Sequence, residues 1–183
     1  MVADPPGALH LSTTMLSADL SSNDIFLRLG AAALAGAVLG VNRDLRGKPA
    51  GLRTHALVTL SSALAVVAIQ EISLGAGQAG VDAASRVIQG LVTGIGFLGA
   101  GVILHAQGEV RGLTSAATIW AAAVLGVAFG GAHWIAGTAG LALTLIILVF
   151  GGTVEGWAHR IFSSDRRAGD PRPRGTGEHR LDD

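Results

Sequence analysis

The side chains best suited to chemistry are concentrated in a basic segment over residues 42–55. This segment contains one carboxylate, Asp44, and four cations, Arg43, Arg46, Lys48 and Arg53. Such a cluster is suited to bind anionic lipid headgroups, a phosphate or an acidic protein surface, or only to orient neighbouring membrane spans. The sequence leaves these alternatives open. Asp44 is also the nearest acidic residue to Arg53, and therefore its candidate partner.

A second candidate site contains carboxylates from the following part of the chain. Glu71 and Asp82 carry the hard oxygen ligands that Mg²⁺ prefers. Asp44, which precedes the expected span 53–71, is a further candidate metal ligand. The simpler alternative is a structural ion pair between a carboxylate and Arg86, with Gln89 one turn further on.

Two other patterns carry little weight. His105 and Glu109 are four residues apart, but Gly108 argues against a shared helical face that binds a metal. Residues 94–99 match the dinucleotide pattern GxGxxG, yet an uncharged segment precedes them and Ile119 stands where an acid is needed. Because cysteine, an HExxH motif and a nucleophile elbow are all missing, we expect no enzyme and no cofactor; Mg²⁺ stays open as ligand or substrate.

The composition indicates that membrane-spanning helices position these residues. The chain has 183 residues, of which 50% are apolar and 14% charged, with 13 basic residues balancing 13 acidic ones and a mean hydropathy of +0.52. This excludes a disordered chain and a nucleic-acid binder with a basic face. Uncharged runs of about 18 residues are long enough to cross hydrocarbon. We expect an all-α, polytopic bundle of five transmembrane helices over residues 25–41, 53–71, 85–104, 113–130 and 133–152; a soluble bundle is the alternative.

The basic residues are distributed asymmetrically around these spans. Eleven of the 13 lie on one side if the N-terminus is outside, leaving Arg28 and Arg86 on the other. The positive-inside rule therefore predicts an N-out, C-in orientation. We expect residues 1–23 to form a flexible outer segment that is not a signal peptide, residues 24–153 the membrane domain, and residues 154–183 a disordered cytoplasmic tail.

Glycine is concentrated inside the expected spans. The pairs Gly36/Gly40, Gly90/Gly94 and Gly126/Gly130 have the small-xxx-small spacing that lets helix backbones approach closely in lipid. The span 85–104 is the most glycine-rich, with Gly90, Gly94, Gly96, Gly99 and Gly101. This density predicts a helix that is buried against neighbours on more than one side.

Three sequence blocks resemble the signature of the MgtC/SapB family of membrane proteins. They are GKPAGLRTH at 47–55, GIGFLGAG at 94–101 and VRGLTSAATIWAAA at 110–123, and the resemblance covers roughly residues 25–150. It implies a multi-pass protein of the bacterial inner membrane, linked to growth in low magnesium and, in pathogens, to virulence. The functional candidates that it implies are Arg43, Asp44, Arg53, Thr54, His55, Asp82, Arg86, Gln89, Gly94, Gly96, Gly99, Gly101, Arg111, Thr114, Thr118 and Trp120.

The resemblance implies a regulatory role, including restraint of the membrane ATP synthase. We therefore expect a regulatory or interaction protein in magnesium homeostasis, whose partners are the lipid bilayer, other membrane proteins and further copies of itself, but no nucleic acid. The alternative is a small transporter or channel for Mg²⁺ or another ion that acts as an oligomer. Asn42 stands where the family commonly has an acid, and up to Asp183 the chain resembles a short form without the family's soluble C-terminal domain.

Overall fold

The computed structural model describes residues 20–106 and 109–166. Five helices in this part of the chain are long and apolar enough to cross a membrane, the last of them over Trp134–Gly151, which confirms the all-α membrane fold. Between the third and fourth of these helices lies a short antiparallel hairpin. The elements are α2 (Ser22–Leu45), α3 (Leu52–Ile72), α4 (Gln78–Gly101), β1 (Leu104–Ala106), β2 (Glu109–Arg111), α5 (Leu113–Gly130) and α6 (Trp134–Arg166).

The expected span 133–152 agrees with Trp134–Gly151, whereas α2 extends the expected 25–41 by three residues before and four after, and two helices differ more strongly from the expectation. Helix α4 begins at Gln78 instead of residue 85 and ends at Gly101, because the turn before it is made by Gly75 and Gly77, both with positive φ, and the hairpin follows it. Helix α6 continues to Arg166, so residues 154–166 of the expected disordered tail are helical. Residues 1–19 and 167–183 of the two expected flexible ends lie outside the described part.

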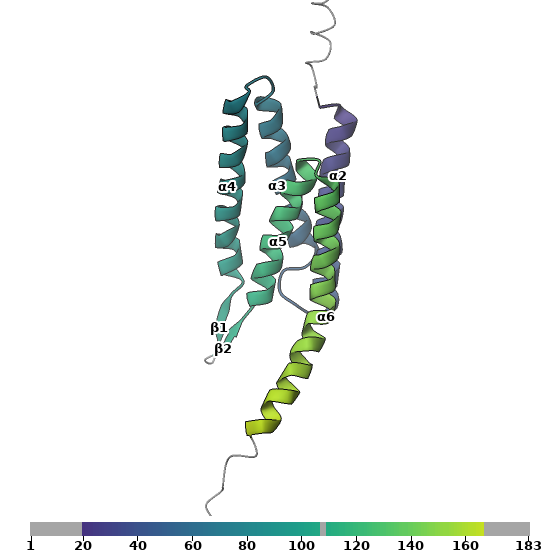
Figure 1. Cartoon of the computed structure of the whole chain (residues 1–183), viewed down its shortest axis with the longest axis vertical. Helices are drawn as coiled ribbons and strands as arrows, with labels where there is room; N and C mark the ends of the chain where they lie inside the picture. Colours follow the sequence, from purple (N-terminus) through teal and green to yellow (C-terminus); the bar gives the residue numbers. More distant parts are fainter. Residues whose placement is uncertain (1–19, 107–108, 167–183) are drawn as a thin grey trace, which may run out of the picture. The chain divides into compact units, whose positions relative to one another are not determined.

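The chain divides into two compact units, Met1–Leu145 and Ile146–Asp183, so that α6 contributes to both. In the first unit α2, α3 and α5 pack against one another, and α4 packs against α3 and α5. Figure 1 shows α3 and α4 as antiparallel neighbours, with the hairpin leading from α4 into α5. The three-helix core of α2, α3 and α5 therefore holds most of the buried residues, and α4 is attached to it from one side.

Glycine sets how closely the core helices approach. A Cβ on Gly36 of α2 would collide with the backbone of α3, and a Cβ on Gly126 or Gly130 of α5 would collide with α3 at Thr59 or Ala63. The pairs Gly36/Gly40 and Gly126/Gly130 thus act as small-residue contacts, as the sequence predicts. Small and aromatic side chains fill the remaining core, with Phe129 and Trp134 in contact at a ring-centroid distance of 6.1 Å.

Helix α4 contradicts the expectation of burial on several sides. Only Gly80 and Gly99 are buried on it, and 6% of its most apolar 18-residue window is buried, against 50% for α5. A Cβ on Gly90, Gly94, Gly96 or Gly101 would meet nothing within 4 Å. The glycines of α4 are therefore largely unused inside this chain.

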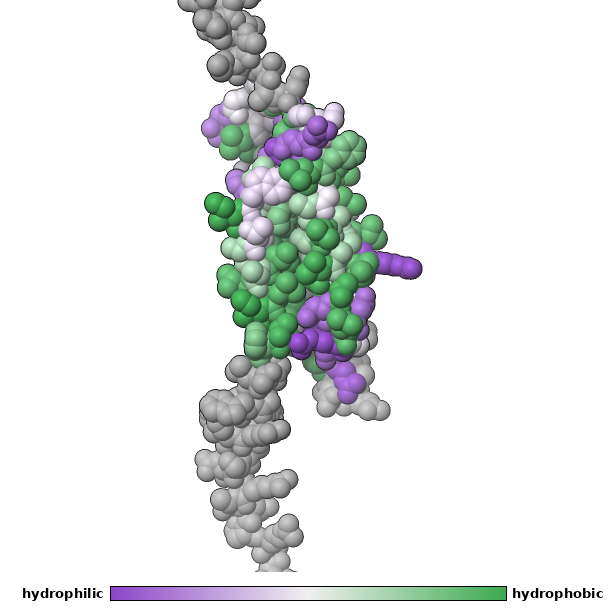
Figure 2. Space-filling view, turned by 90° about the vertical axis from the view of Figure 1, so that its right-hand side faces the viewer, coloured by the Kyte–Doolittle hydropathy of each residue, from purple (hydrophilic) through white to green (hydrophobic). Residues whose placement is uncertain are grey.

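The surface shows the zoning of a membrane protein. In Figure 2 hydrophobic side chains cover the middle of the face in view, and hydrophilic side chains gather toward its two ends. Exposed leucine, isoleucine, valine and phenylalanine side chains occur on all five helices. Such an exposed apolar band is stable only when hydrocarbon surrounds it.

Candidate functional site

A buried polar cluster occupies the end of the core where α2 finishes and α3 and α5 begin, which we call the Arg43 end. Arg43, in the last turn of α2, is 3% exposed and donates from Nη2 to the Ser115 hydroxyl of α5 at 2.7 Å. His55, in the first turn of α3, is fully buried, and its Nδ1 lies 3.0 Å from the Gly51 carbonyl oxygen. The Arg43–Ser115 bond thus joins α2 to α5, and His55 of α3 is buried at the same end; Arg43 and His55 are both candidates that the sequence predicts.

Three buried polar atoms at the Arg43 end have no hydrogen-bond partner among the residues that the structure describes. They are Nε of Arg43, Nε2 of His55 and Oδ1 of Asn42. Asp44 lies beside this cluster, because its carboxylate approaches Gly51, whose carbonyl oxygen lies next to the His55 ring. Two buried hydroxyls nearby, Thr59 and Thr118, bond instead to carbonyls of their own helices.

Asp44 organises the connection between α2 and α3. Its Oδ2 accepts a hydrogen bond of 2.9 Å from the backbone N–H of Leu52, the first residue of α3. A Cβ on Gly51 would collide with the Asp44 carboxylate, so that a larger residue there would displace the carboxylate from its present position. The structure therefore gives Asp44 the role of a helix cap, which satisfies an otherwise unpaired N–H. Its sequence-based candidate partner, Arg53, is exposed, as is Thr54.

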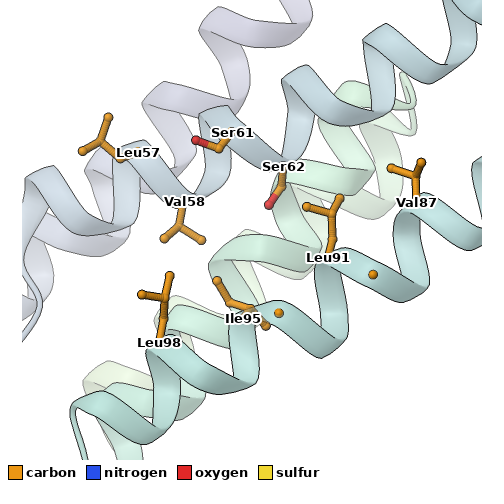
Figure 3. A pocket seen from close by; sticks show the side chains of 10 residues that line it. Leu57, Val58, Ser61, Ser62, Val87, Leu91, Ile95 and Leu98 are labelled. Atoms are coloured by element: carbon orange, nitrogen blue, oxygen red, sulfur yellow. The ribbon is translucent and has the colours of Figure 1, made fainter.

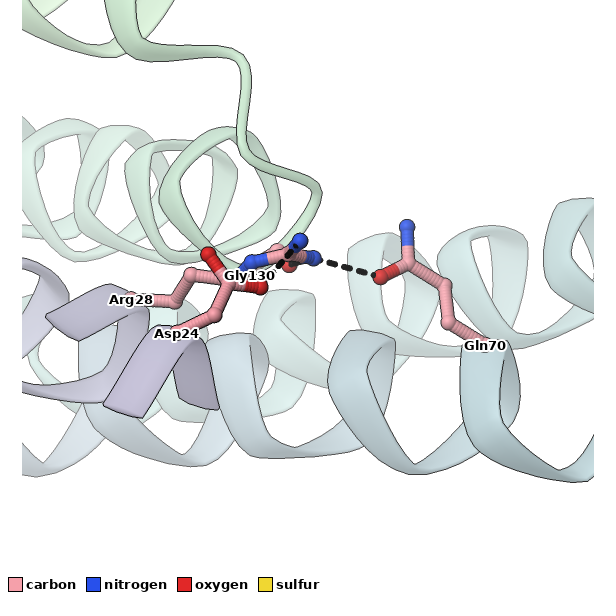
Figure 4. A network of polar contacts seen from close by, with 4 residues as sticks. All are labelled: Asp24, Arg28, Gln70 and Gly130. Carbon is pink, nitrogen blue, oxygen red and sulfur yellow. Dashed lines mark hydrogen bonds and ion pairs between the residues drawn. The ribbon is translucent and has the colours of Figure 1, made fainter. Parts of the chain in front are cut away.

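The opposite end of the core, which we call the Arg28 end, holds a second polar network. Arg28 of α2 is 9% exposed; it pairs with Asp24 one turn earlier at 2.5 Å and donates to the Gln70 side chain of α3 at 2.9 Å and the Gly130 carbonyl of α5 at 3.2 Å. Figure 4 shows the guanidinium reaching across to both helices. Because α3 and α5 end here, the cation faces the negative ends of two helix dipoles.

Arg28 does not belong to the site residues that the sequence predicts. Its signal is nevertheless visible there, because it is the single charge between Ile25 and Val41. A lone charge in an apolar span faces protein or water and has a partner, and in this chain Gln70 and the end of α5 supply the bonds. The network borders a hollow of about 490 Å³ that is also lined by Gly77 and Gly80.

The polar candidates of α4 point away from the core. Asp82, Arg86 and Gln89 are all exposed, as is Thr93. Asp82 accepts a hydrogen bond of 3.2 Å from the Gln78 side chain four residues earlier on the same helix. The structure therefore brings these residues together as one outward-facing group and not as part of either buried cluster.

The remaining signature residues are dispersed. Gly99 packs against Ala116 of α5, whereas Gly94, Gly96 and Gly101 face open space. Arg111 lies on β2 and is exposed, Thr114 is exposed, and Trp120 is 48% exposed on α5. The hairpin pairs His105 with Val110 and Ala106 with Glu109, so that His105 and Glu109 lie on facing strands and not on one helix.

An apolar groove of about 520 Å³ separates α4 from α3. Figure 3 shows Leu91, Ile95 and Leu98 of α4 opposite Val58 and Ser62 of α3. Gly90 and Gly94 also line this groove, and their missing side chains leave it wide. The contact between α4 and α3 is therefore looser than the contacts inside the three-helix core.

The candidate metal ligands do not converge. Glu71 and Asp82 are exposed, and Asp44 caps the opposite end of α3, about 28 Å away along a helix of this length. Among the described residues no three His, Asp or Glu side chains are grouped so that they could hold a metal ion.

A comparison with protein families decides the relationship. The MgtC family model matches residues 29–157, most of the described chain. The chain belongs to the MgtC family. The buried Arg43, His55 and Thr118 and the outward-facing group on α4 all lie inside this matched region of an MgtC-family protein, whereas Arg28 lies one residue before it.

Several curated proteins are similar to this MgtC-family chain. Protein SrpB of Synechococcus elongatus is 43% identical over 129 residues, which cover 66% of this chain and 71% of SrpB. YhiD of Escherichia coli K12, named as a candidate magnesium transporter, is 39% identical over 128 residues, covering 68% and 59%. Protein MgtC of Salmonella typhimurium is 42% identical over 122 residues, covering 67% of this chain but 48% of that protein. No solved structure matches.

Proposed function

We propose that this chain is a regulatory or interaction protein of the bacterial inner membrane that acts in magnesium homeostasis and adaptation to low magnesium. Its membership of the MgtC family and the magnesium-related name of its relative YhiD support the link to magnesium. Its partners are the bilayer and other membrane proteins, and the family resemblance implies the membrane ATP synthase as one of them. It acts without a cofactor and catalyses no reaction.

One observation carries the preference for regulation over transport. The charged side chains that are buried in the described helices are the cations Arg28 and Arg43, and no carboxylate is buried with them. A Mg²⁺ pathway through one copy would need oxygen ligands along its length, and the buried Arg43 guanidinium, which pairs with no carboxylate among the described residues, repels a divalent cation. The arrangement is suited to hold three helices in place, and less to conduct a cation.

Transport is the second candidate function, and it rests on a different surface. Asp82, Gln89 and Thr93 present oxygen atoms on the exposed side of α4. If several copies placed these side chains around a common axis, they would line a path that one copy lacks. The carboxylates at 71 and 82 would then meet the ion first.

The test measures Mg²⁺ entry into proteoliposomes that contain the purified full chain, with a Mg²⁺-sensitive dye inside and insertion verified by protease accessibility. The matched variant carries Glu71→Gln together with Asp82→Asn. We expect no flux above that of empty vesicles, while the same chain restores growth in low magnesium to a strain that lacks it. Flux that the double variant abolishes would overturn the regulatory proposal and establish transport.

If neither flux nor growth depends on the chain, the magnesium assignment itself is wrong. Growth that depends on the chain without any flux supports regulation, and capture of the membrane ATP synthase with the full chain then tests the implied partner.

A further inference from the structure

Helix α4 is anomalous among the five spans. It has the lowest mean hydropathy of the five and also the smallest buried share, 6% of its most apolar window. Helix α6 shows the usual relation between exposure and apolar character, because its span is only 11% buried and has the highest mean hydropathy of the five. A span that faces lipid on most sides should be the most apolar one, and α4 is the least.

The polar residues of α4 lie on one face. Gln78, Asp82, Arg86, Gln89 and Thr93 follow one another at steps of four, four, three and four residues, which keeps them on a single side of an α-helix. All five are exposed. We call this side the polar face of α4.

The opposite side of α4 is apolar and faces the protein. Val87, Leu91 and Ile95 recur every four residues and line the groove toward α3. Helix α4 thus has its apolar side toward the core. Among the described helices, α3 and α5 make the substantial contacts with it. Its amphipathicity is the reverse of what a lipid-exposed helix requires.

Polar groups in hydrocarbon need partners that this chain does not provide. Gln89 lies at the middle of the span, and no described residue bonds to its side-chain amide or to the Arg86 guanidinium. An unpaired amide or cation at that depth is costly, so charged and amide side chains of spans face protein or a water-filled cavity. The polar face therefore requires an occupant.

We propose that the occupant is the polar face of α4 from a second copy of this chain, in a parallel two-fold dimer. Copies inserted in the same direction place identical residues at the same depth, so the face must complement itself. An amide both donates and accepts, which lets Gln89 pair with Gln89 of the second copy. Asp82 and Arg86 carry opposite charges one turn apart, so each Arg86 reaches the Asp82 of the other copy and the two pairs are equivalent.

The small residues beside the polar face permit this approach. Gly90 and Gly96 are exposed, and a Cβ on either would meet nothing within the chain. Two helices without side chains at these positions come close enough for amide and hydroxyl groups to bond across the interface. The dimer is compatible with the proposed regulatory role and competes with the transport alternative, because both use the polar face of α4.

Cysteine cross-linking tests the interface directly, because the natural chain contains no cysteine. Single variants Gln89→Cys and Thr93→Cys place a thiol on the polar face. Leu91→Cys and Ile95→Cys place it at the same depth on the opposite side and are the matched controls. In membranes treated with an oxidant, we expect disulfide-linked dimers at 89 and 93 in several times the yield found at 91 and 95, since a disulfide needs Cβ atoms about 4 Å apart.

A charge exchange between copies provides the second test. Asp82→Arg gives a copy with two cations on the polar face, and Arg86→Asp a copy with two anions. Each variant alone should be largely monomeric in nanodiscs, and co-expression of the two should restore dimers, which a pair within one helix cannot explain. Equal cross-linking on both sides of α4, monomers of the natural chain, or a heterologous membrane protein cross-linked at 89 in place of a second copy would each overturn the proposal.

Discussion

Replacement of Gly126 by alanine tests whether close backbone contact holds the core together. A Cβ at this position would collide with the Thr59 carbonyl oxygen of α3 and lie 2.7 Å from the Ser62 Cβ and 3.0 Å from the Thr59 carbonyl carbon. Such distances are shorter than real Cβ atoms tolerate, and backbone atoms cannot rotate away. Helices α5 and α3 must therefore separate if the substituted chain is to fold.

The expected cost follows from two opposing effects. Overpacking of a tight contact costs about 1–3 kcal/mol, while alanine has a helix propensity better than that of glycine by up to about 1 kcal/mol. We therefore expect Gly126→Ala to lower the free energy of unfolding by about 1–2 kcal/mol. Gly30→Ala is the matched control, because a Cβ on Gly30 of α2 would meet nothing within 4 Å.

The assay is reversible unfolding in mixed detergent micelles, followed by circular dichroism and performed at protein concentrations where the natural chain is monomeric. We expect Gly30→Ala to be as stable as the natural chain or slightly more stable. If Gly126→Ala and Gly30→Ala have the same free energy of unfolding, the close contact between α5 and α3 does not determine stability as the geometry indicates, and the reasoning fails.

Three further predictions concern the polar residues. Arg28→Leu removes the bonds to the Gln70 side chain of α3 and to the Gly130 carbonyl. We expect this variant to lower the free energy of unfolding by about 1–3 kcal/mol in the same assay, and Asp24→Asn to lower it by less. An unchanged stability of Arg28→Leu would contradict the role of this network. Asp44→Ala removes the cap of α3 and should lower the free energy of unfolding by about 0.5–2 kcal/mol. Asp44→Asn keeps the acceptor oxygen and should lower it by less. Equal losses in the two variants would indicate that the charge of Asp44 matters and not its hydrogen bond. The single variant Glu71→Gln, which leaves the proposed Asp82–Arg86 pairs in place, should leave chain-dependent growth in low magnesium intact if no ion is handled there, and loss of growth with normal membrane abundance would refute this.

Much of the fold is predictable from the sequence because hydrocarbon tolerates few charges. Uncharged runs mark all five spans, and the bounds of α3 and α5 agree with the expected residues 53–71 and 113–130 within a residue. The start of α4 differs from the expectation because Asp82 and Arg86 resemble a boundary in the sequence, although the helix continues through both residues and carries them on its exposed polar face. The end of α6 differs because polarity alone does not predict disorder, and no proline occurs between Gly151 and Arg166.

The candidate site is predictable in part. The basic segment contains Arg43 and His55, which the structure buries together, because a cation and an imidazole beside apolar spans need polar partners. The bond to Ser115 is beyond the reach of the sequence, since it depends on how α2 and α5 are rotated against each other. The sequence also does not predict which side of α4 faces the core. Its many glycines indicate that another helix can approach closely, but they do not identify that helix.

The two buried arginines of α2 hold that helix in place at both ends of the core. Arg28 bonds to α3 and α5 at one end and Arg43 to α5 at the other, and the fifteen-residue step from one to the other spans about 22 Å of helix. Sliding of α2 along its axis by a full helical turn would strain both sets of bonds together, and a large rotation would turn both side chains away from their acceptors. A piston-like movement of α2 is therefore opposed by bonds at both of its ends. Movement of α4 breaks no such bonds to α3, because the groove between the two helices leaves room and the turn that precedes α4 contains Gly75 and Gly77.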